Sequence, residues 1–569
     1  MTDPQARAGR GMEQEELVFV ALGGLGEIGM NVYLYGLGPP DSRRWLMVDL
    51  GITFPGEAEP GVDVVLPDLR FIEEERTALA GIVLTHAHED HLGAVIDLWP
   101  RLKAPIWATP FTAAMLDSKL AENGRRLKLP VNVVDLGARF RVGPFDLEFV
   151  TLAHSIPEPS GLVIRTPLGV VFHSGDWKLD RTPLVGDPSD DARLRALGEE
   201  GITALVCDST NAFREGRSPS EVEVAASIAA IIKGAERRVA VTTFASNVAR
   251  IRAVADAARA AGRHLVVVGR ALHRVIEVAK ATGYLPADFR YLDQEQFSYL
   301  EPQEVVALCT GSQGEPRAAL ARIAEDDHPD VSLADGDLAI FSSRPIPGNE
   351  KAIARVQNNL ARLGCRIITD ADALVHVTGH PRREELRQIY AWLRPKVAVP
   401  MHGEVRHLRA HGDLARAAGV PEVRTPADGE MLRLAPDPVA VIDEVPVGRQ
   451  YRDGALIVPA DPGPVRERRK LAFVGVIAVG FALDVGGNLL GEPEAALDGV
   501  PAETMDGRSM YDLVLDAVDG TLKSIPPGRR RDIERVREAV RRAVRAAVDQ
   551  AWGKRPIVKV LITTVPNRF

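Results

Sequence analysis

The sequence predicts an α/β protein in which a small parallel α/β domain is inserted into a larger strand-rich domain, followed by an α+β domain. Two observations lead to this fold class. Segments rich in histidine and aspartate follow apolar, strand-like runs both before residue 210 and after residue 370, so one site draws on both regions. Between them, helix and strand patterns alternate, which is typical of a parallel sheet with crossover helices.

The inserted domain is expected to begin with a helix at Ser220, where serine can cap the helix and acidic residues occupy its first turn. Strands are predicted at 238–242 and 264–268, with a helix starting at Asn247 between them. We expect residues 366–369 to form a strand that returns to the strand-rich domain.

These changes of pattern predict the domain boundaries. Residues 12–210 would form the first part of the strand-rich domain, 211–360 the inserted domain and 361–440 the second part of the strand-rich domain. Residues 441–470 contain several prolines and are predicted to be a loop-rich linker. Residues 471–569 would form the C-terminal domain.

The C-terminal domain is predicted from three segments. Residues 471–483 and 557–562 have the character of strands, and 529–552 that of an amphipathic helix. We expect the arginines of this helix to be solvated, with RNA contact or a subunit interface as alternatives. Its apolar face would hold Ile533, Val536, Val540, Val544, Ala547 and Val548.

Composition is ordinary for a globular protein, with 46% apolar and 26% charged residues in 569. The cysteines at 207, 309 and 365 lie in or beside apolar runs and are expected to be buried and unpaired. Residues 1–4 begin no signal sequence, and the apolar run 471–483 is too short to cross a membrane. We therefore expect a cytoplasmic protein. The net charge of −9 does not exclude nucleic acid, because basic segments occur at 466–470 and 529–531.

The densest chemical signal is the segment 85–91, which places His86, His88, Asp90 and His91 directly after an apolar run. Imidazole and carboxylate are ligands that zinc and similar ions prefer. The two histidines at spacing two would share one side of an extended chain. A solvated polar loop is the alternative, but it rarely gathers three of 13 histidines in six positions.

Further candidate ligands each follow a strand-like run. His154 comes after 145–152, Asp176 after 168–172 and His402 after 396–401. Asp49 also follows such a run upstream of the dense segment. This order predicts a hydrolytic centre with two metal ions.

The pattern resembles the metallo-β-lactamase superfamily, whose hallmark is H-x-H-x-D-H followed by single His, Asp and His residues. The resemblance implies an αββα sandwich and two Zn²⁺ ions, with Mn²⁺ or Mg²⁺ as alternatives. Asp49 would orient the ligands. The resemblance assigns the ligands as follows: His86, His88 and His154 to one ion, Asp90, His91 and His402 to the other, and Asp176 to both.

Three later elements resemble the motifs of the β-CASP nucleases, namely 206–211 with Asp208, 376–380 and 400–404. Within that group, strings at 23–29, 243–247, 310–316 and 342–350 resemble bacterial ribonuclease J. The resemblance runs from about residue 17 to about residue 435.

The resemblance also implies functional residues. Asp208 and His380 would be an acid–base pair, although Asp208 could instead only orient His380 or a ligand. The substrate-binding residues implied by the resemblance are Phe244, Ala245, Ser246, His376, Val377, Thr378, Gly379 and His380.

The family implies a zinc-dependent ribonuclease with endonuclease and 5′-to-3′ exonuclease action on RNA with a 5′ monophosphate, in RNA maturation and decay. It also implies a homodimer or homotetramer, RNA-decay protein partners and no membrane. The alternatives are a DNA-processing β-CASP nuclease, a hydrolase of thioesters or lactams, and a non-catalytic RNA-binding scaffold. The inserted domain argues against a small substrate, and the full ligand set argues against a scaffold.

Three further segments of the sequence carry weaker indications of function. Gly24-x-Gly26-x-x-Gly29 imitates a dinucleotide fingerprint, but a strand rather than a helix follows it, which favours a turn near the metal site. The segment 310–315 is either a tight turn or a phosphate cradle. Some family members have an acid after Val-Gly where this chain has Arg449, which argues against an extra structural cation.

Overall fold

The computed structural model describes residues 14–122, 124, 127–461 and 463–566. Some predictions concern residues outside these ranges. They are the absence of a signal sequence at 1–4, the ends of the predicted domains at 12–13 and 567–569, and residue 462 of the predicted linker. The described chain forms two compact units, one of residues 14–53 and 65–449 and one of residues 54–64 and 450–566.

The first unit contains an eight-stranded sheet. The strands on one side of this sheet pair antiparallel, and those on the other side pair in parallel. Its strands begin with the buried run 16–23, as its apolar sequence predicts. In sheet order they are β24 (Ala440–Glu444), β23 (Glu430–Ala435), β1 (Glu16–Gly23), β3 (Val32–Gly38), β4 (Arg44–Val48), β6 (Leu79–Val83), β7 (Ile106–Ala108) and β8 (Val131–Val133).

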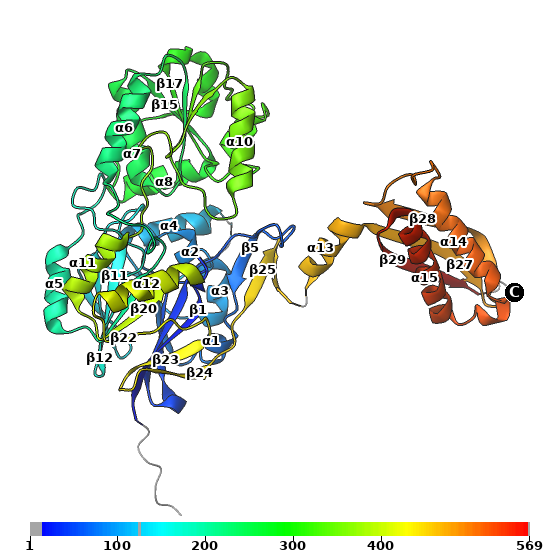
Figure 1. The fold of residues 1–569 in the computed structure, drawn as a ribbon, viewed down its shortest axis with the longest axis horizontal. Helices are drawn as coiled ribbons and strands as arrows, with labels where there is room; N and C mark the ends of the chain where they lie inside the picture. Colours follow the sequence, from blue (N-terminus) through cyan, green and yellow to red (C-terminus); the bar gives the residue numbers. More distant parts are fainter. Residues whose placement is uncertain (1–13, 123, 125–126, 462, 567–569) are drawn as a thin grey trace, which may run out of the picture. The chain divides into compact units, whose positions relative to one another are not determined.

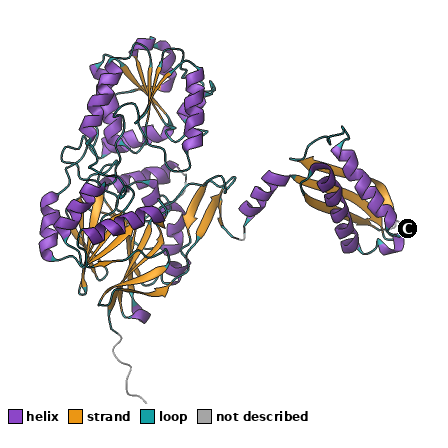
Figure 2. Ribbon diagram, in the orientation of Figure 1, coloured by secondary structure: helices purple, strands orange, loops and turns teal. Residues whose placement is uncertain are grey.

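A seven-stranded sheet packs face to face against the first one (Figures 1 and 2). Phe19 and Val48 of the first sheet share a core with Phe149 and Val399 of the second, all fully buried. The strands, in sheet order, are β22 (Glu422–Val423), β20 (Val397–Met401), β13 (Ala204–Asp208), β12 (Gly169–His173), β11 (Ser160–Thr166), β10 (Phe145–Thr151) and β9 (Arg139–Val142).

Helices cover the outer faces of both sheets, which gives four layers. On the first sheet, Phe71 of a covering helix packs edge-on against Trp45 of β4. Leu46 and Val48 of the same strand point the other way, into the core. The helices on this side are α1 (Arg70–Glu74), α2 (Glu89–Leu92), α3 (Val95–Leu102) and α4 (Pro110–Glu122). Those sharing a core with the second sheet are α5 (Asp191–Glu200), α11 (Arg383–Leu393) and α12 (Val405–Ala417).

The inserted domain leaves the second sheet after β13 and forms its own six-stranded parallel sheet with helices on both faces (Figure 2). As predicted, Ser220 caps the first helix in a capping box with Glu223. The strands are β16 (Leu292–Asp293), β15 (His264–Val268), β17 (Val305–Cys309), β14 (Val239–Thr242), β18 (Leu338–Phe341) and β19 (Arg366–Ile368). The helices are α6 (Glu221–Lys233), α7 (Val248–Ala260), α8 (Arg270–Ala281), α9 (Ala319–Ala324) and α10 (Glu350–Arg362).

Two expectations, one about residues 366–369 and one about residues 441–470, were wrong. Strand β19 pairs in parallel with β18, so residues 366–368 belong to the inserted sheet rather than to the second part of the larger domain. A strand of three residues carries too little pattern to identify its sheet. Residues 441–470 are also not mainly loop, because β24, β25 (Arg449–Asp453), β26 (Leu456–Pro459) and α13 (Pro464–Val474) run through them.

The second unit contains a three-stranded sheet in which β27 pairs with an antiparallel and a parallel neighbour. Two helices cover it, and Val536, Val540, Val544 and Val548 of the longer one are fully buried, as predicted. The expected strand at 471 begins only at Val476, because α13 continues to Val474. The elements are β27 (Val476–Asp484), β28 (Leu489–Asp498), α14 (Met510–Ser524), α15 (Ile533–Trp552) and β29 (Ile557–Val565).

Several helix arginines of α15 are ion-paired at its surface, for example Arg541 and Arg542 with Glu538. Cys207, Cys309 and Cys365 are buried and unpaired, as expected. None of the helices in the described part of the chain is long and apolar enough to cross a membrane.

Candidate metal centre

The predicted ligands meet where strands of the two sheets end. His86 and His88 follow β6, and Asp90 and His91 lie in the short helix α2 that comes next. From the second sheet, His154 follows β10, Asp176 follows β12 and His402 follows β20. Strand endings at one edge bring together residues that are far apart in the sequence, as at the ligand sites of other α/β proteins.

Three imidazoles form the first group of ligands. Nδ1 of His88 lies 3.1 Å from Nε2 of His86 and 3.1 Å from Nε2 of His154. Burial and the neighbouring imidazoles lower the pKa of His86 and His154 well below the usual value, and burial lowers that of His88 to about 4. All three rings are therefore neutral, the form that binds a metal ion.

Asp90, His91 and His402 form the second group, and Asp176 belongs to both. Oδ2 of Asp176 lies 3.2 Å from Nε2 of His91 and 3.4 Å from Nε2 of His402. It also lies 3.9 Å from Nε2 of His86 and 3.7 Å from Nε2 of His154. This carboxylate oxygen thus lies within 3.9 Å of Nε2 of four histidines.

The charge state of Asp176 fits a ligand. Burial alone would raise its pKa, but the imidazoles of His402, His91 and His380 together hold the pKa well below its usual range. Its other oxygen, Oδ1, is buried and accepts no hydrogen bond among the described residues. A buried carboxylate oxygen without a partner is costly unless a cation or water occupies its lone pairs.

Hydrogen bonds fix which ring nitrogen faces the centre. Asp49 accepts from Nδ1 of His91 at 2.7 Å and from the hydroxyl of Thr85 at 2.9 Å. The hydroxyl of Thr85 donates its proton to Asp49. The oxygen of the same hydroxyl therefore accepts from Nδ1 of His86 at 3.0 Å. Nδ1 of His154 donates to the carbonyl of Gly379 at 2.7 Å.

Each of these rings therefore turns its Nε2 towards Asp176, and in His86 and His154, whose lowered pKa values keep the rings neutral, this nitrogen is unprotonated. Converging lone pairs repel one another unless a cation lies between them, so the donor set fits metal ions held by nitrogen and carboxylate oxygen. Asp49 and His402 have positive φ angles of 64° and 51°, a strained backbone for residues with side chains. Such strain occurs where a site requires a particular side-chain direction.

Asn31 is a site residue that the sequence reasoning missed. It is fully buried, and its Oδ1 accepts from Nδ1 of His402 at 2.9 Å and from the hydroxyl of Tyr33 at 2.8 Å. Its Nδ2 donates to the carbonyl of Asp90 at 3.0 Å. It thus orients ligands of the second group. The only signal in the sequence is its position just after the Gly24–Gly29 turn.

Asp208 and His380 form a close pair beside this centre. Nδ1 of His380 lies 2.7 Å from Oδ2 of Asp208 and 3.8 Å from Oδ2 of Asp176. Burial lowers the pKa of His380, but the carboxylates of Asp208, Asp176 and Asp90 outweigh it and raise the pKa to about 9. His380 therefore carries a proton at neutral pH in this arrangement.

The segment 376–380 lies against the ligands. Gly379 approaches His154 so closely that a Cβ atom there would lie 2.4 Å from its Nδ1, so only glycine fits. Oγ1 of Thr378 accepts from Nδ2 of Asn211 at 2.8 Å. His376 is buried, and its Nδ1 has no hydrogen-bond partner among the described residues. Val377 is buried, with 1% of its surface exposed.

The other predicted substrate residues, Phe244, Ala245 and Ser246, are half-buried in the turn between β14 and α7. No hydrogen bond joins them to the ligands of either group in the part of the chain described. The structure therefore brings the ligands, Asp208 and the segment 376–380 together, and leaves this turn on the inserted domain.

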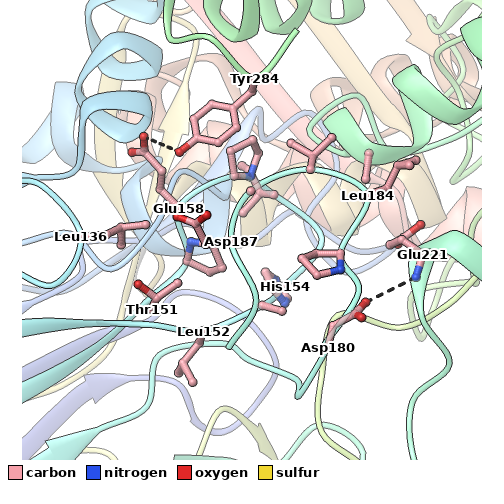
Figure 3. Close-up of a pocket in the computed structure, with 18 residues that line it drawn as sticks. Leu136, Thr151, Leu152, His154, Glu158, Asp180, Leu184, Asp187, Glu221 and Tyr284 are labelled. Carbon is pink, nitrogen blue, oxygen red and sulfur yellow. Dashed lines mark hydrogen bonds between the residues drawn. The ribbon is translucent and has the colours of Figure 1, made fainter. Parts of the chain in front are cut away.

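A small pocket of about 20 Å³ lies beside His154, between the larger and the inserted domain (Figure 3). Here Tyr284 of the inserted domain donates to Oε1 of Glu158 at 2.9 Å. Oε2 of Glu158 accepts from the backbone of Phe111 at 2.7 Å. One buried carboxylate thus connects the inserted domain to the loop that carries His154.

The glycine-rich segment forms a turn at the centre, as predicted. Gly24, Gly26 and Gly29 all have positive φ, and the carbonyl of Gly24 accepts from the backbone of His402 at 2.9 Å. Arg449 pairs with Glu27 of this turn at 2.6 Å.

Comparisons with known families cover most of the chain. Residues 44–194 match a beta-lactamase superfamily domain and residues 236–360 the beta-CASP domain of ribonuclease J. Residues 366–426 match a Zn-dependent metallo-hydrolase RNA specificity domain, and residues 463–565 the ribonuclease J C-terminal domain.

Related proteins agree with these matches. The chain is 52% identical to ribonuclease J of Sinorhizobium meliloti over 99% of this chain and 100% of that protein. It is 37% identical to ribonuclease J of Mycolicibacterium smegmatis over 95% of each chain.

Among solved structures, a protein of unknown function from Enterococcus faecalis matches with a TM-score of 0.51 and 17% identity. The match covers 74% of this chain and 100% of that one, which shows a shared fold. The four layers are thus a metallo-β-lactamase domain, with an inserted β-CASP domain and a C-terminal domain. The chain therefore belongs to the ribonuclease J family of metal-dependent ribonucleases.

Proposed function

We propose that this protein hydrolyses RNA phosphodiesters at a centre that would hold two zinc ions, with Asp176 in both groups of ligands. The observation that carries the proposal is the position of Asp176 Oδ2, between 3.2 and 3.9 Å from Nε2 of four histidines. His86, His88 and His154 would hold one ion, and Asp90, His91 and His402 the other. Bound there, the ions would supply an acidified water and neutralise charge that develops on the attacked phosphate.

The residues of the chain supply the remaining chemistry. His380, with a pKa raised to about 9, is placed to give a proton to the oxygen that leaves. Asp208 holds its Nδ1 and stabilises the charged ring. Asp49 and Asn31 keep the ligand rings turned inwards.

The segment 376–380 would hold the substrate beside the ions. The backbone amide of Gly379 and the hydroxyl of Thr378 are suited to phosphate oxygens. Phe244, Ala245 and Ser246 would contact the strand farther along, from the inserted domain.

We further propose, from the family resemblance, both endonuclease and 5′-to-3′ exonuclease action, with preference for a 5′ monophosphate. RNA maturation and decay would be the setting. A homodimer or homotetramer and RNA-decay protein partners belong to the same proposal.

Cleavage of matched RNA and DNA oligonucleotides, with 5′ monophosphate or 5′ triphosphate ends, tests this function. We expect cleavage of RNA, shortening from the 5′ end when a monophosphate is present, and loss of activity in His86→Ala and His402→Ala. Preferential cleavage of DNA would favour the DNA-processing alternative. Undiminished cleavage by the two variants would contradict the ligand assignment.

A further inference from the structure

Three arginines, Arg214, Arg344 and Arg382, come from chain segments that contact the segment 376–380 or adjoin it, and they act electrostatically on one another. Arg214 follows Asn211, whose side chain donates to Thr378 and to the carbonyl of His380. Arg382 comes two residues after His380. Arg344 lies on the loop after β18. The side chains of all three arginines are half-buried.

Local contacts hold these arginines close to the centre. The backbone of Arg383 donates to the carbonyl of Arg214 at 2.9 Å, which joins two of the three chain segments. Two residues of extended chain span about 7 Å at most, so Arg382 lies close to His380. The third segment is joined through Ser342, whose hydroxyl donates to the carbonyl of Val375 at 2.7 Å.

The loop that carries Arg344 is also fixed. Nε2 of Gln313 donates to the carbonyl of Arg344 at 2.9 Å, and its Oε1 accepts from the backbone of Ile346 at 2.8 Å. The guanidinium of Arg344 pairs with Asp370 at 3.0 Å, which is the one ion pair that any of the three arginines forms within the described chain. The turn at 310–315 therefore supports this loop.

Carboxylates near the other two arginines are already occupied. Glu215 pairs with Arg383 and Arg387, and Glu384 pairs with Arg217. Both oxygens of Glu385 accept from backbone amides. Arg214 and Arg382 have no ion-pair partner in the chain as described, and Nε of each is buried without a hydrogen bond.

The positive charges also act on one another. Burial, Arg344 and Arg382 lower the pKa of Arg214 and outweigh the opposing effect of Asp370. Burial and Arg344 lower the pKa of Arg382 and outweigh the opposing effect of Glu385. The guanidinium of Arg214 lies 5.4 Å from the centre of the ring of Phe213. This cation–π contact helps to hold the arginine side chain in place. Cations held together without enough counter-charge favour an anionic ligand.

We propose that Arg214, Arg344 and Arg382 form a phosphate-binding subsite that holds the RNA strand beside the scissile bond. The proposal rests on the proposed ribonuclease function and extends it to the neighbouring phosphates. Planar guanidinium groups with free N–H donors match phosphate oxygens in pairs. The ligand is either the 5′-terminal phosphate or an internal phosphodiester, and both share this chemistry.

The test compares Arg214→Gln, Arg382→Gln and their double variant with wild type and with Arg217→Gln. Arg217 lies on the same loop but is paired with Glu384, so it is a matched control. Binding of the metal-loaded enzyme to a phosphorothioate RNA is measured by fluorescence anisotropy over a range of salt concentrations. Steady-state cleavage of the corresponding RNA gives kcat and KM, and melting temperatures check folding.

We expect each single variant to raise Kd and KM about tenfold, with a smaller change in kcat. The slope of log Kd against log salt should decrease by about 0.7 per lost contact with a single strand. Arg217→Gln should behave like wild type. An effect confined to RNA with a 5′ phosphate identifies the terminal phosphate, and an equal effect on 5′-hydroxyl RNA identifies internal phosphodiesters.

Unchanged Kd and salt slope in the double variant would overturn the subsite. This outcome is distinct from failure of the proposed function, in which the wild-type enzyme binds RNA without cleaving it. A double variant with a lowered melting temperature is replaced by Arg214→Lys and Arg382→Lys. These keep the charge but lose the paired donors, and should show a smaller rise in Kd with an unchanged salt slope.

Discussion

The side-chain oxygen of Asn31 lies 2.9 Å from Nδ1 of His402, although 371 positions separate the two residues. The contact leaves Nε2 of His402 free to face Asp176. The orientation of a predicted metal ligand therefore depends on an amide directly before β3 of the first sheet.

Asn31→Ala should weaken binding of the ion held by Asp90, His91 and His402 by about 10- to 100-fold, because residues that orient ligands have effects of this size. Competition with a chelator measures the affinity. Tyr33→Phe, which removes only a hydrogen bond to Asn31, should have a smaller effect. Wild-type affinity in Asn31→Ala would show that His402 needs no orienting partner.

Asp208→Asn tests proton transfer to the leaving group. RNA has a strongly basic leaving oxygen, so we expect kcat to fall by about 10²- to 10⁴-fold. A p-nitrophenyl phosphodiester has a leaving group that needs no proton, and its cleavage should fall much less. Equal losses on both substrates would mean that Asp208 only positions His380 or a ligand.

The buried pair of Arg250 and Glu221, 2.7 Å apart, should stabilise the inserted domain. Arg250 is fully buried and also donates to the carbonyl of Val375 at 2.7 Å, just before His376. Arg250→Met leaves Glu221 buried without a partner and should cost about 3–5 kcal/mol of unfolding free energy. Chemical denaturation measures the loss.

The double variant Arg250→Met/Glu221→Met is the control for that pair. Removal of both charges should restore much of the stability, since no unpaired charge remains. A double variant as unstable as the single one would assign the loss to packing instead.

Glu148 should give the protein a stability that depends on pH. Burial raises its pKa, but hydrogen bonds from Arg193 and Arg165 outweigh this and lower the pKa to about 2 from 4.5. A carboxylate with a lowered folded pKa stabilises fully above the unfolded value and loses this contribution as pH falls. Glu148→Gln should therefore lower the unfolding midpoint near pH 7, and the difference should shrink from about pH 4.5 towards pH 2.

Denaturation midpoints of wild type and Glu148→Gln at several pH values provide the measurement. Glu74→Gln, at an exposed position, is the control and should show no such dependence. A difference that stays constant down to pH 2 would contradict the role given to the arginines.

The sequence could predict which candidate ligands meet in the structure, because each belongs to a dense motif or follows a strong strand pattern. The contacts that orient them could not be predicted. Asn31 and His402, or Glu158 and Tyr284, meet only through the tertiary fold, and their local sequence carries no sign of the partner. The positive φ of His402 is likewise imposed by the surrounding structure.

The errors in the fold have a similar origin. Strand β19 has three residues, which suit either sheet until its register with β18 is known. The prolines after residue 440 suggested loop, yet Pro459 ends an edge strand and Pro464 begins α13, two positions where proline is tolerated.

Metal content measured together with RNA cleavage tests the central claim most directly. Wild type should contain about two ions per subunit and cleave RNA, whereas Asp176→Ala should lose both ions and the activity, because one carboxylate contacts both groups of ligands. His264→Ala, at an exposed position, should retain both ions and activity. An Asp176→Ala protein that keeps two ions and cleaves RNA at the wild-type rate would contradict the account.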